Sequence, residues 1–141
     1  MRIDSMRDSS RRVLVVALGV VVAGLGIFAA PAQAASWSSY LSKVPTGFES
    51  RRWYEPNTAT TIKFTGCSTD QNAVRVTLAK DISLSPDTYY STAAFTNCLK
   101  GSTYTSTGNW NAHGNANHYF SINEYLVGTT VTTVKSLTVS C

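Results

Sequence analysis

Hydrophobic residues follow two different patterns along the chain. One continuous apolar run of 18 residues extends from Val13 to Ala30, behind a charged start. From Thr58 onward, hydrophobic and polar residues instead alternate with a period of two, which is typical of strands with one buried face. The first pattern predicts an export leader, and the second predicts a domain built from β-strands.

The alternation locates individual strands. Val74, Val76 and Leu78 are separated by single residues, and Ile62 and Phe64 form a similar run earlier in the chain. Further strand runs contain the following hydrophobic residues: Phe95, Phe120, Ile122, Leu137 and Val139. About six or seven strands predict an all-β fold, an antiparallel β-sandwich. Periodicity does not order the strands, so an immunoglobulin-like and a jelly-roll arrangement fit equally.

The leader divides the chain into parts. Residues 1–34 have the layout of a secretory signal peptide, because the apolar run is followed by Pro31 and the small-residue triplet Ala32-Gln33-Ala34. Cleavage after Ala34 leaves 35–141 as one mature domain. We divide it into an N-terminal arm, 35–57, and a β-sandwich, 58–141. The predicted location is therefore secreted, extracellular.

An uncleaved anchor is the alternative, since about 17 to 25 apolar residues span a bilayer. Gly19, Gly24 and Pro31 favour removal instead, so no membrane contact is expected after cleavage. The leader resembles those of exported proteins of Gram-positive bacteria, and the resemblance covers only this segment. The pair Arg11-Arg12 leaves both the general and the twin-arginine export route open.

The composition of residues 35–141 agrees with a β-structured domain. Ser and Thr make up 32 of these 107 residues, and Thr suits a strand with one face in water. Eight basic residues against six acidic ones leave a net charge of +2, and only Arg51 and Arg52 are adjacent. The strong positive electrostatic potential expected of a nucleic-acid-binding protein is therefore missing, and no nucleic acid is expected as a partner.

Three cysteines remain after the leader: Cys67, Cys98 and Cys141. Two of them should pair in an oxidising compartment, and three pairings are open. We favour a Cys67–Cys98 disulfide, which closes a segment of about 30 residues. Cys141 is then left at the end of the chain, where it is compatible with a monomer or with a disulfide-linked dimer.

Catalytic and metal-binding signatures are missing from the sequence. It contains no Gly-x-Ser-x-Gly, His-Glu-x-x-His or Cys-x-x-Cys motif and no phosphate-binding glycine loop. His113 and His118 would need a third metal ligand, and Glu124 is the only carboxylate nearby. We therefore expect a binding protein rather than an enzyme, with no metal and no cofactor.

The segment 108–117 is the most distinctive part of the mature sequence. It places Trp110 among Asn109, Asn111 and His113 on a predicted loop. An indole ring stacks on a sugar ring, and amides bond to sugar hydroxyls, so these residues with Trp53 are the candidate ligand-binding set. The alternative is that the amides serve the turn while Trp110 fills the core.

These residues favour a secreted binding module that contacts a polysaccharide or cell-wall glycan. The alternative is a protein-interaction module, such as an inhibitor or a toxin-like effector, that binds a protein surface. Its candidate patch is Arg51-Arg52-Trp53-Tyr54, because Trp, Tyr and Arg are enriched at protein interfaces.

Overall fold

The computed structural model describes residues 36–123 and 130–141. The predicted leader and Glu124 lie outside these residues. The described chain contains nine strands and one short 3₁₀ helix: β1 (Ser36–Pro45), β2 (Phe48–Glu49), β3 (Trp53–Glu55), β4 (Thr60–Thr69), β5 (Val74–Lys80), β6 (Thr88–Phe95), η1 (Asn97–Leu99), β7 (Thr105–Trp110), β8 (Ala116–Ile122) and β9 (Val131–Ser140). None of its helices is long and apolar enough to cross a membrane.

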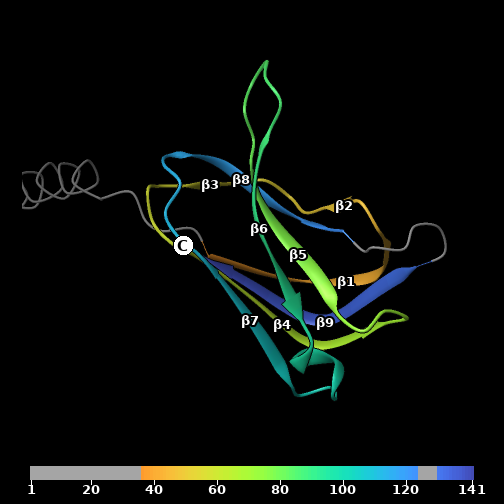
Figure 1. Cartoon of the computed structure of the whole chain (residues 1–141). Helices are drawn as coiled ribbons and strands as arrows, with labels where there is room; N and C mark the ends of the chain where they lie inside the picture. The colour runs from red at the N-terminus through yellow and green to blue at the C-terminus, as the bar shows by residue number, and fades with distance from the viewer. Residues whose placement is uncertain (1–35, 124–129) are drawn as a thin grey trace, which may run out of the picture. The chain divides into compact units, whose positions relative to one another are not determined.

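The strands form two antiparallel sheets that pack face to face (Figure 1), which confirms the predicted β-sandwich. The first sheet has the order β1-β9-β4-β7, and the second has the order β2-β8-β5-β6, with β3 also paired to β8. Counting β2 and β3 as one interrupted strand gives the orders 1-8-3-6 and 2-7-4-5. This is the jelly-roll arrangement, one of the two that the sequence left open.

The strand count exceeds the expected six or seven because the predicted N-terminal arm contributes β1, β2 and β3. The pairing of β1 with β9 is interrupted by register shifts between Ser39 and Leu41 and between Leu41 and Val44. The first shift adds a residue to β9, and the second adds one to β1, where it breaks the period of two. The hydrophobic residues of β1 therefore do not alternate regularly, and the hydropathy pattern of residues 36–45 does not predict a strand.

The core lies between the two sheets and is rich in aromatic residues. Phe64 of β4 meets Phe95 of β6 edge to face, with ring centroids 5.1 Å apart, and meets Phe120 of β8 at 5.6 Å. All three side chains are buried. Because these contacts join strands of opposite sheets, burial of the aromatic rings is what holds the sandwich together.

The predicted Cys67–Cys98 disulfide is present and ties β4 to η1. The Cys98 amide donates to the Ser106 hydroxyl over 2.8 Å, which fastens η1 to β7 as well. Cys141 lies outside this disulfide and is half-buried. A disulfide of this kind is compatible with an extracellular protein.

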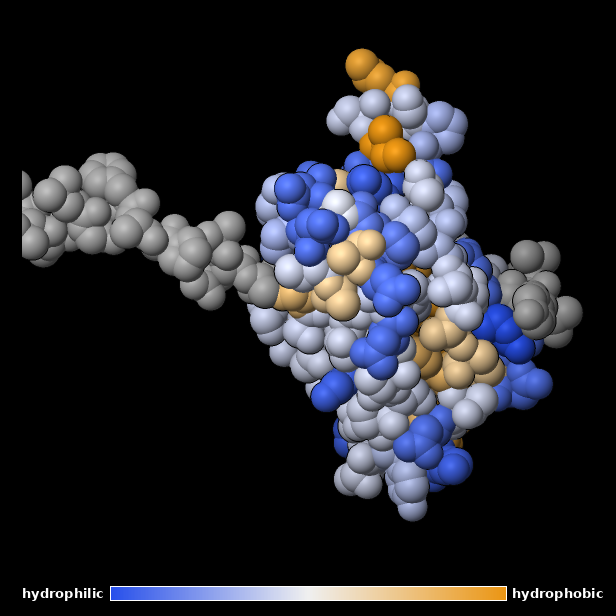
Figure 2. Space-filling view, turned by 60° about the vertical axis from the view of Figure 1, so that its left-hand side comes forward, coloured by the Kyte–Doolittle hydropathy of each residue, from blue (hydrophilic) through white to orange (hydrophobic). Residues whose placement is uncertain are grey.

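A hairpin loop between β5 and β6 projects from the sandwich (Figure 1). Its segment 81–87 carries two hydrophobic side chains, Ile82 and Leu84, and the Leu84 side chain is fully exposed. Hydrophobic surface is accordingly visible on the projecting hairpin in Figure 2. Leu84 also has a φ of 60°, a conformation that costs an L-residue about 1–2 kcal/mol.

Candidate functional site

The candidate site is the outward surface of the first sheet, built by strand alternation. In β4, Ile62 and Phe64 point into the core, so Thr61, Lys63 and Thr65 point outward. The register of β4 with β7 and β9 then aligns the outward residues in three rows. We call this array the hydroxyl face: Thr61, Lys63, Thr65, Thr105, Thr107, Asn109, Ser136, Thr138 and Ser140.

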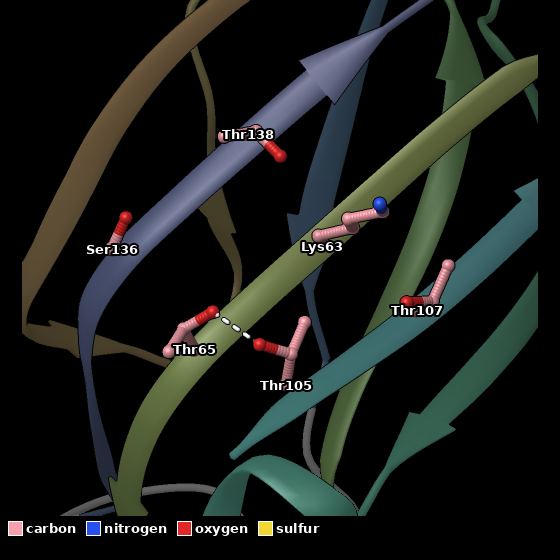
Figure 3. A pocket seen from close by; sticks show the side chains of 6 residues that line it. All are labelled: Lys63, Thr65, Thr105, Thr107, Ser136 and Thr138. Atoms are coloured by element: carbon pink, nitrogen blue, oxygen red, sulfur yellow. Dashed lines mark hydrogen bonds between the residues drawn. The ribbon is translucent and has the colours of Figure 1, made fainter. Parts of the chain in front are cut away.

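Six of these residues line a hollow of about 550 Å³ on the outward surface: Lys63, Thr65, Thr105, Thr107, Ser136 and Thr138. Figure 3 shows their side chains rising from three neighbouring strands toward the same side of the sheet. Five of the six side chains end in hydroxyl groups, which both donate and accept hydrogen bonds. The sixth contributes the only charge in the hollow.

Hydrogen bonds within the hydroxyl face fix part of the array. The hydroxyls of Thr65 and Thr105 lie 2.7 Å apart, and the Thr61 hydroxyl donates to Asn109 Oδ1 over 2.8 Å. Among the described residues, the Asn109 amide nitrogen has no acceptor, so its two hydrogens point to the open side of the sheet. These bonds restrict the side-chain conformations of Thr61, Thr65, Thr105 and Asn109, so this part of the array is preorganised.

Asn109 and Trp110 are neighbours in sequence but lie on opposite faces of β7. Trp110 is only 4% exposed, and its indole N–H donates to the Ser91 carbonyl of β6 over 2.7 Å. A Cβ atom at Gly108 would lie 2.7 Å from the indole ring, so the glycine makes room for it. Trp110 therefore fills one end of the core, as the alternative interpretation held.

Trp53 is also only 4% exposed, and its ring lies 5.6 Å from that of Trp37. Neither Trp53 nor Trp110 offers a ring face to a sugar, so the predicted stacking platform is absent from these two residues. Burial in the core explains the difference, because large rings gain more free energy there than on the surface.

The other predicted residues occupy the connection between β7 and β8. Asn111 is exposed, whereas His113 is half-buried and stacks on Tyr90 with ring centroids 3.5 Å apart. The His113 carbonyl accepts a hydrogen bond from Lys80 Nζ over 3.0 Å. Burial lowers the pKa of His113, and the nearby His118 lowers it further, so its imidazole is neutral at pH 7. Of the five predicted ligand-binding residues, only Asn109 lies on the hydroxyl face.

A buried polar pair that the sequence did not reveal lies beside this connection. His118 Nδ1 is 3.2 Å from Glu55 Oε2 and 3.1 Å from the Ala116 carbonyl, and both side chains are buried. Thr60 donates its hydroxyl hydrogen to Glu55. This pair does not meet solvent, so it is no site for substrate chemistry. Among the described residues, no cluster of three or more His, Cys, Asp or Glu side chains is placed to hold a metal ion.

A second cluster supports the projecting hairpin. Asp87 accepts hydrogen bonds from the Tyr119 hydroxyl over 2.6 Å and from the Ile82 amide over 3.0 Å. The hydrogen bond from Tyr119 lowers the pKa of Asp87 the most, and the hydrogen bond from the Ile82 amide lowers it further. Arg52 lies over the Tyr119 ring at 3.7 Å and bonds to Asp81 over 3.2 Å. The base of the hairpin is therefore tied to β8 on both sides.

Comparisons with known proteins give no family for this chain. No protein-family model matches it, and no curated protein is similar to it in sequence. Among solved structures, the crystal structure of the SPBc2 prophage-derived protein YomS is similar to 79% of this chain and 96% of its own chain. The identity is 11% and the TM-score is 0.45. The function of this chain must therefore be argued from its own surface.

Proposed function

We propose that this protein is an exported jelly-roll module that binds glycans through the hydroxyl face. The single observation that carries the proposal is the array of hydroxyl, amide and ammonium groups on three adjacent strands. Glycans present the complementary set of hydroxyl donors and acceptors at a similar density. The export leader and the Cys67–Cys98 disulfide support a location where extracellular glycans are met.

The proposed ligand class is the one that the sequence favoured, a glycan. The proposed contact surface is now the hydroxyl face instead of the segment 108–117 with Trp53. The hydroxyl face has no exposed aromatic ring among its nine residues, so affinity rests on hydrogen bonds and shape rather than on stacking. Each net hydrogen bond contributes only about 0.5–1.5 kcal/mol. Binding of a single sugar should therefore be weak, and a polymer that spans several rows should bind more tightly.

Affinity electrophoresis in gels that contain a dissolved polysaccharide tests the proposal. Retardation of the protein should be lost in a Thr107→Ala, Thr138→Ala double variant, because both hydroxyls line the hollow beside Lys63. Thr88→Ala is the matched control, because Thr88 is an exposed strand threonine on β6 of the other sheet. If the double variant is retarded as strongly as Thr88→Ala, the hydroxyl face does not bind the polysaccharide.

A second candidate function is protein interaction through the projecting hairpin. The observation that favours it is the fully exposed Leu84 on a loop whose base is fixed by Asp87. A preorganised loop that presents an apolar side chain loses little entropy when a partner protein covers it. Leu84→Asp should abolish such an interaction while leaving glycan retardation unchanged, which separates the two functions.

A further inference from the structure

Charge is distributed unequally between the two sheets. The strands of the first sheet contain three lysines and no carboxylate: Lys43 on β1, Lys63 on β4 and Lys135 on β9. The described carboxylates lie on the second sheet or in loops: Glu49, Glu55, Asp70, Asp81 and Asp87. The net charge after the leader is small, so this is a local asymmetry rather than a long-range field.

A second hollow continues the hydroxyl face along the same strands. It measures about 270 Å³ and is lined by Gly66, Cys67, Ser68, Gly101, Ser102, Thr133 and Lys135. The first hollow uses Lys63 and Thr65 of β4, and the second begins at the next residue of that strand. The two hollows therefore follow one another along β4 and β9.

Gly66 keeps the second hollow open and brings Lys135 close to β4. Its φ is +68°, and a Cβ atom there would lie 3.0 Å from the Ser102 carbonyl oxygen and 3.2 Å from Lys135 Cβ. Lys135 of β9 therefore lies beside Gly66, the residue that follows Thr65 of the first hollow. Each hollow thus carries one ammonium group, that of Lys63 in the first and that of Lys135 in the second.

Neither lysine is neutralised by the protein. Within the described part of the chain, no ion pair or side-chain hydrogen bond involves the ammonium group of Lys63 or of Lys135, and both residues are exposed. An exposed ammonium group gains most from a ligand that brings a carboxylate or phosphate, because charge-assisted hydrogen bonds are the stronger kind. The hydroxyls around each lysine suit the neutral part of such a ligand.

We infer that the two hollows together bind an acidic glycan, with Lys63 and Lys135 each receiving an anionic group of the same polymer. This inference rests on the proposed function and narrows its ligand class. The anion is a carboxylate in a uronic acid polymer or a phosphate in a sugar- or polyol-phosphate polymer. Both present the same chemistry to an ammonium group: a negative charge among hydroxyls.

The test compares three polymers in binding titrations with the purified protein: polygalacturonate, a polyol-phosphate teichoic acid and neutral dextran. Lys63→Met and Lys135→Met keep the aliphatic stem of each side chain and remove its charge. Each should weaken binding to an acidic polymer about tenfold, the value of one hydrogen bond to a charged group. Lys100→Met is the matched control, because Lys100 is an exposed lysine that lines neither hollow.

The outcomes separate this inference from the proposed function. Preference for an acidic polymer that is lost in both lysine variants but kept in Lys100→Met supports it, and the preferred polymer identifies the anion. Equal binding of dextran and of the acidic polymers, unchanged in the variants, overturns the acidic ligand and keeps the glycan proposal. No binding to any polymer by folded protein overturns both. Binding of duplex DNA as tight as that of the acidic polymers overturns the glycan specificity.

Discussion

The outward surfaces of the two sheets differ, although both are built by the same alternation. On the first sheet, the outward residues of β4, β7 and β9 are polar and mostly open to solvent, and all but the lysines are short. On the second sheet, the outward residues Tyr119 and Ser121 of β8 are buried. Arg52 covers the Tyr119 ring, and Asp87 at the hairpin base receives the Tyr119 hydroxyl.

This difference shows that alternation decides which way a side chain points but not whether that side is free. The surface of the second sheet at β8 is covered by residues distant in sequence, from the segment before β3 and from the hairpin loop, whereas β6 stays largely exposed. In the described part of the chain, the hollow on the first sheet is lined only by residues of β4, β7 and β9, and no loop residue covers it. A ligand-binding surface in a β-sandwich is thus selected by what the loops leave uncovered.

The largest effect is expected in the core that both sheets share. Phe120→Ala removes the ring that contacts Trp37, Phe48 and Phe64 and should lower the free energy of unfolding by about 3–5 kcal/mol. Urea denaturation followed by circular dichroism measures this. Phe48→Ala, at a half-buried edge position, should cost less, and an equal cost would contradict the central role of Phe120.

The cover of the second sheet is expected to depend on one hydroxyl group. Tyr119→Phe keeps the ring beneath Arg52 and removes the hydrogen bond to Asp87. The hairpin base should then open more often, and hydrogen exchange of the Ile82 amide should accelerate several-fold while the core amides stay protected. Tyr54→Phe is the control, because the Tyr54 side chain is exposed. Unchanged Ile82 exchange would mean that Asp87 alone holds the loop.

His113, in the connection between β7 and β8, should make the free energy of unfolding depend on pH. Because the pKa of His113 is lowered below its ordinary 6.5, the unfolded chain binds a proton more readily than the folded one. The stabilising contribution is therefore present above pH 6.5 and is lost as the pH falls through the lowered pKa. His113→Phe keeps a ring on Tyr90 and should flatten this part of the pH profile of the melting temperature. An identical profile in this variant would assign the dependence to another group.

The smallest effect on stability is expected at the hydroxyl face. Thr107→Ala and Thr138→Ala should each change the free energy of unfolding by no more than about 0.5 kcal/mol, since both side chains are exposed. Thermal melts of the single variants check this. A loss of several kcal/mol would mean that the hydroxyl face serves the fold, and lost ligand retardation would then be uninformative.

Much of the fold was predictable because regular alternation and turn residues are local signals. The strands around Ile62, Val76 and Leu137 were found this way, and the Cys67–Cys98 disulfide followed from the loop it closes. The irregular pairing of β1 removed the same signal from residues 36–45. The choice of jelly roll over immunoglobulin-like order depends on which strands pair, and that information is not local.

The candidate site was less predictable for the same reason. The segment around Trp110 was predicted as a loop, whereas residues 105–110 form β7, and the inward direction of Trp110 removes its expected role in ligand contact. The signal that would have found the hydroxyl face was present in the sequence. The outward residues of β4 and β9 are the complement of the hydrophobic positions that predicted the core, but which strands pair with β4 cannot be read from that pattern.

The projecting hairpin also has a practical consequence. Its exposed residues Ser83, Leu84 and Ser85 lie beyond the paired ends of β5 and β6, away from the strands that carry the hydroxyl face. Loop tips of this kind tolerate inserted sequence and are preferred sites of proteolytic cleavage. A peptide tag or a second domain inserted at Leu84 should thus leave the hydroxyl face unobstructed, which makes this loop a suitable attachment point for immobilising the protein.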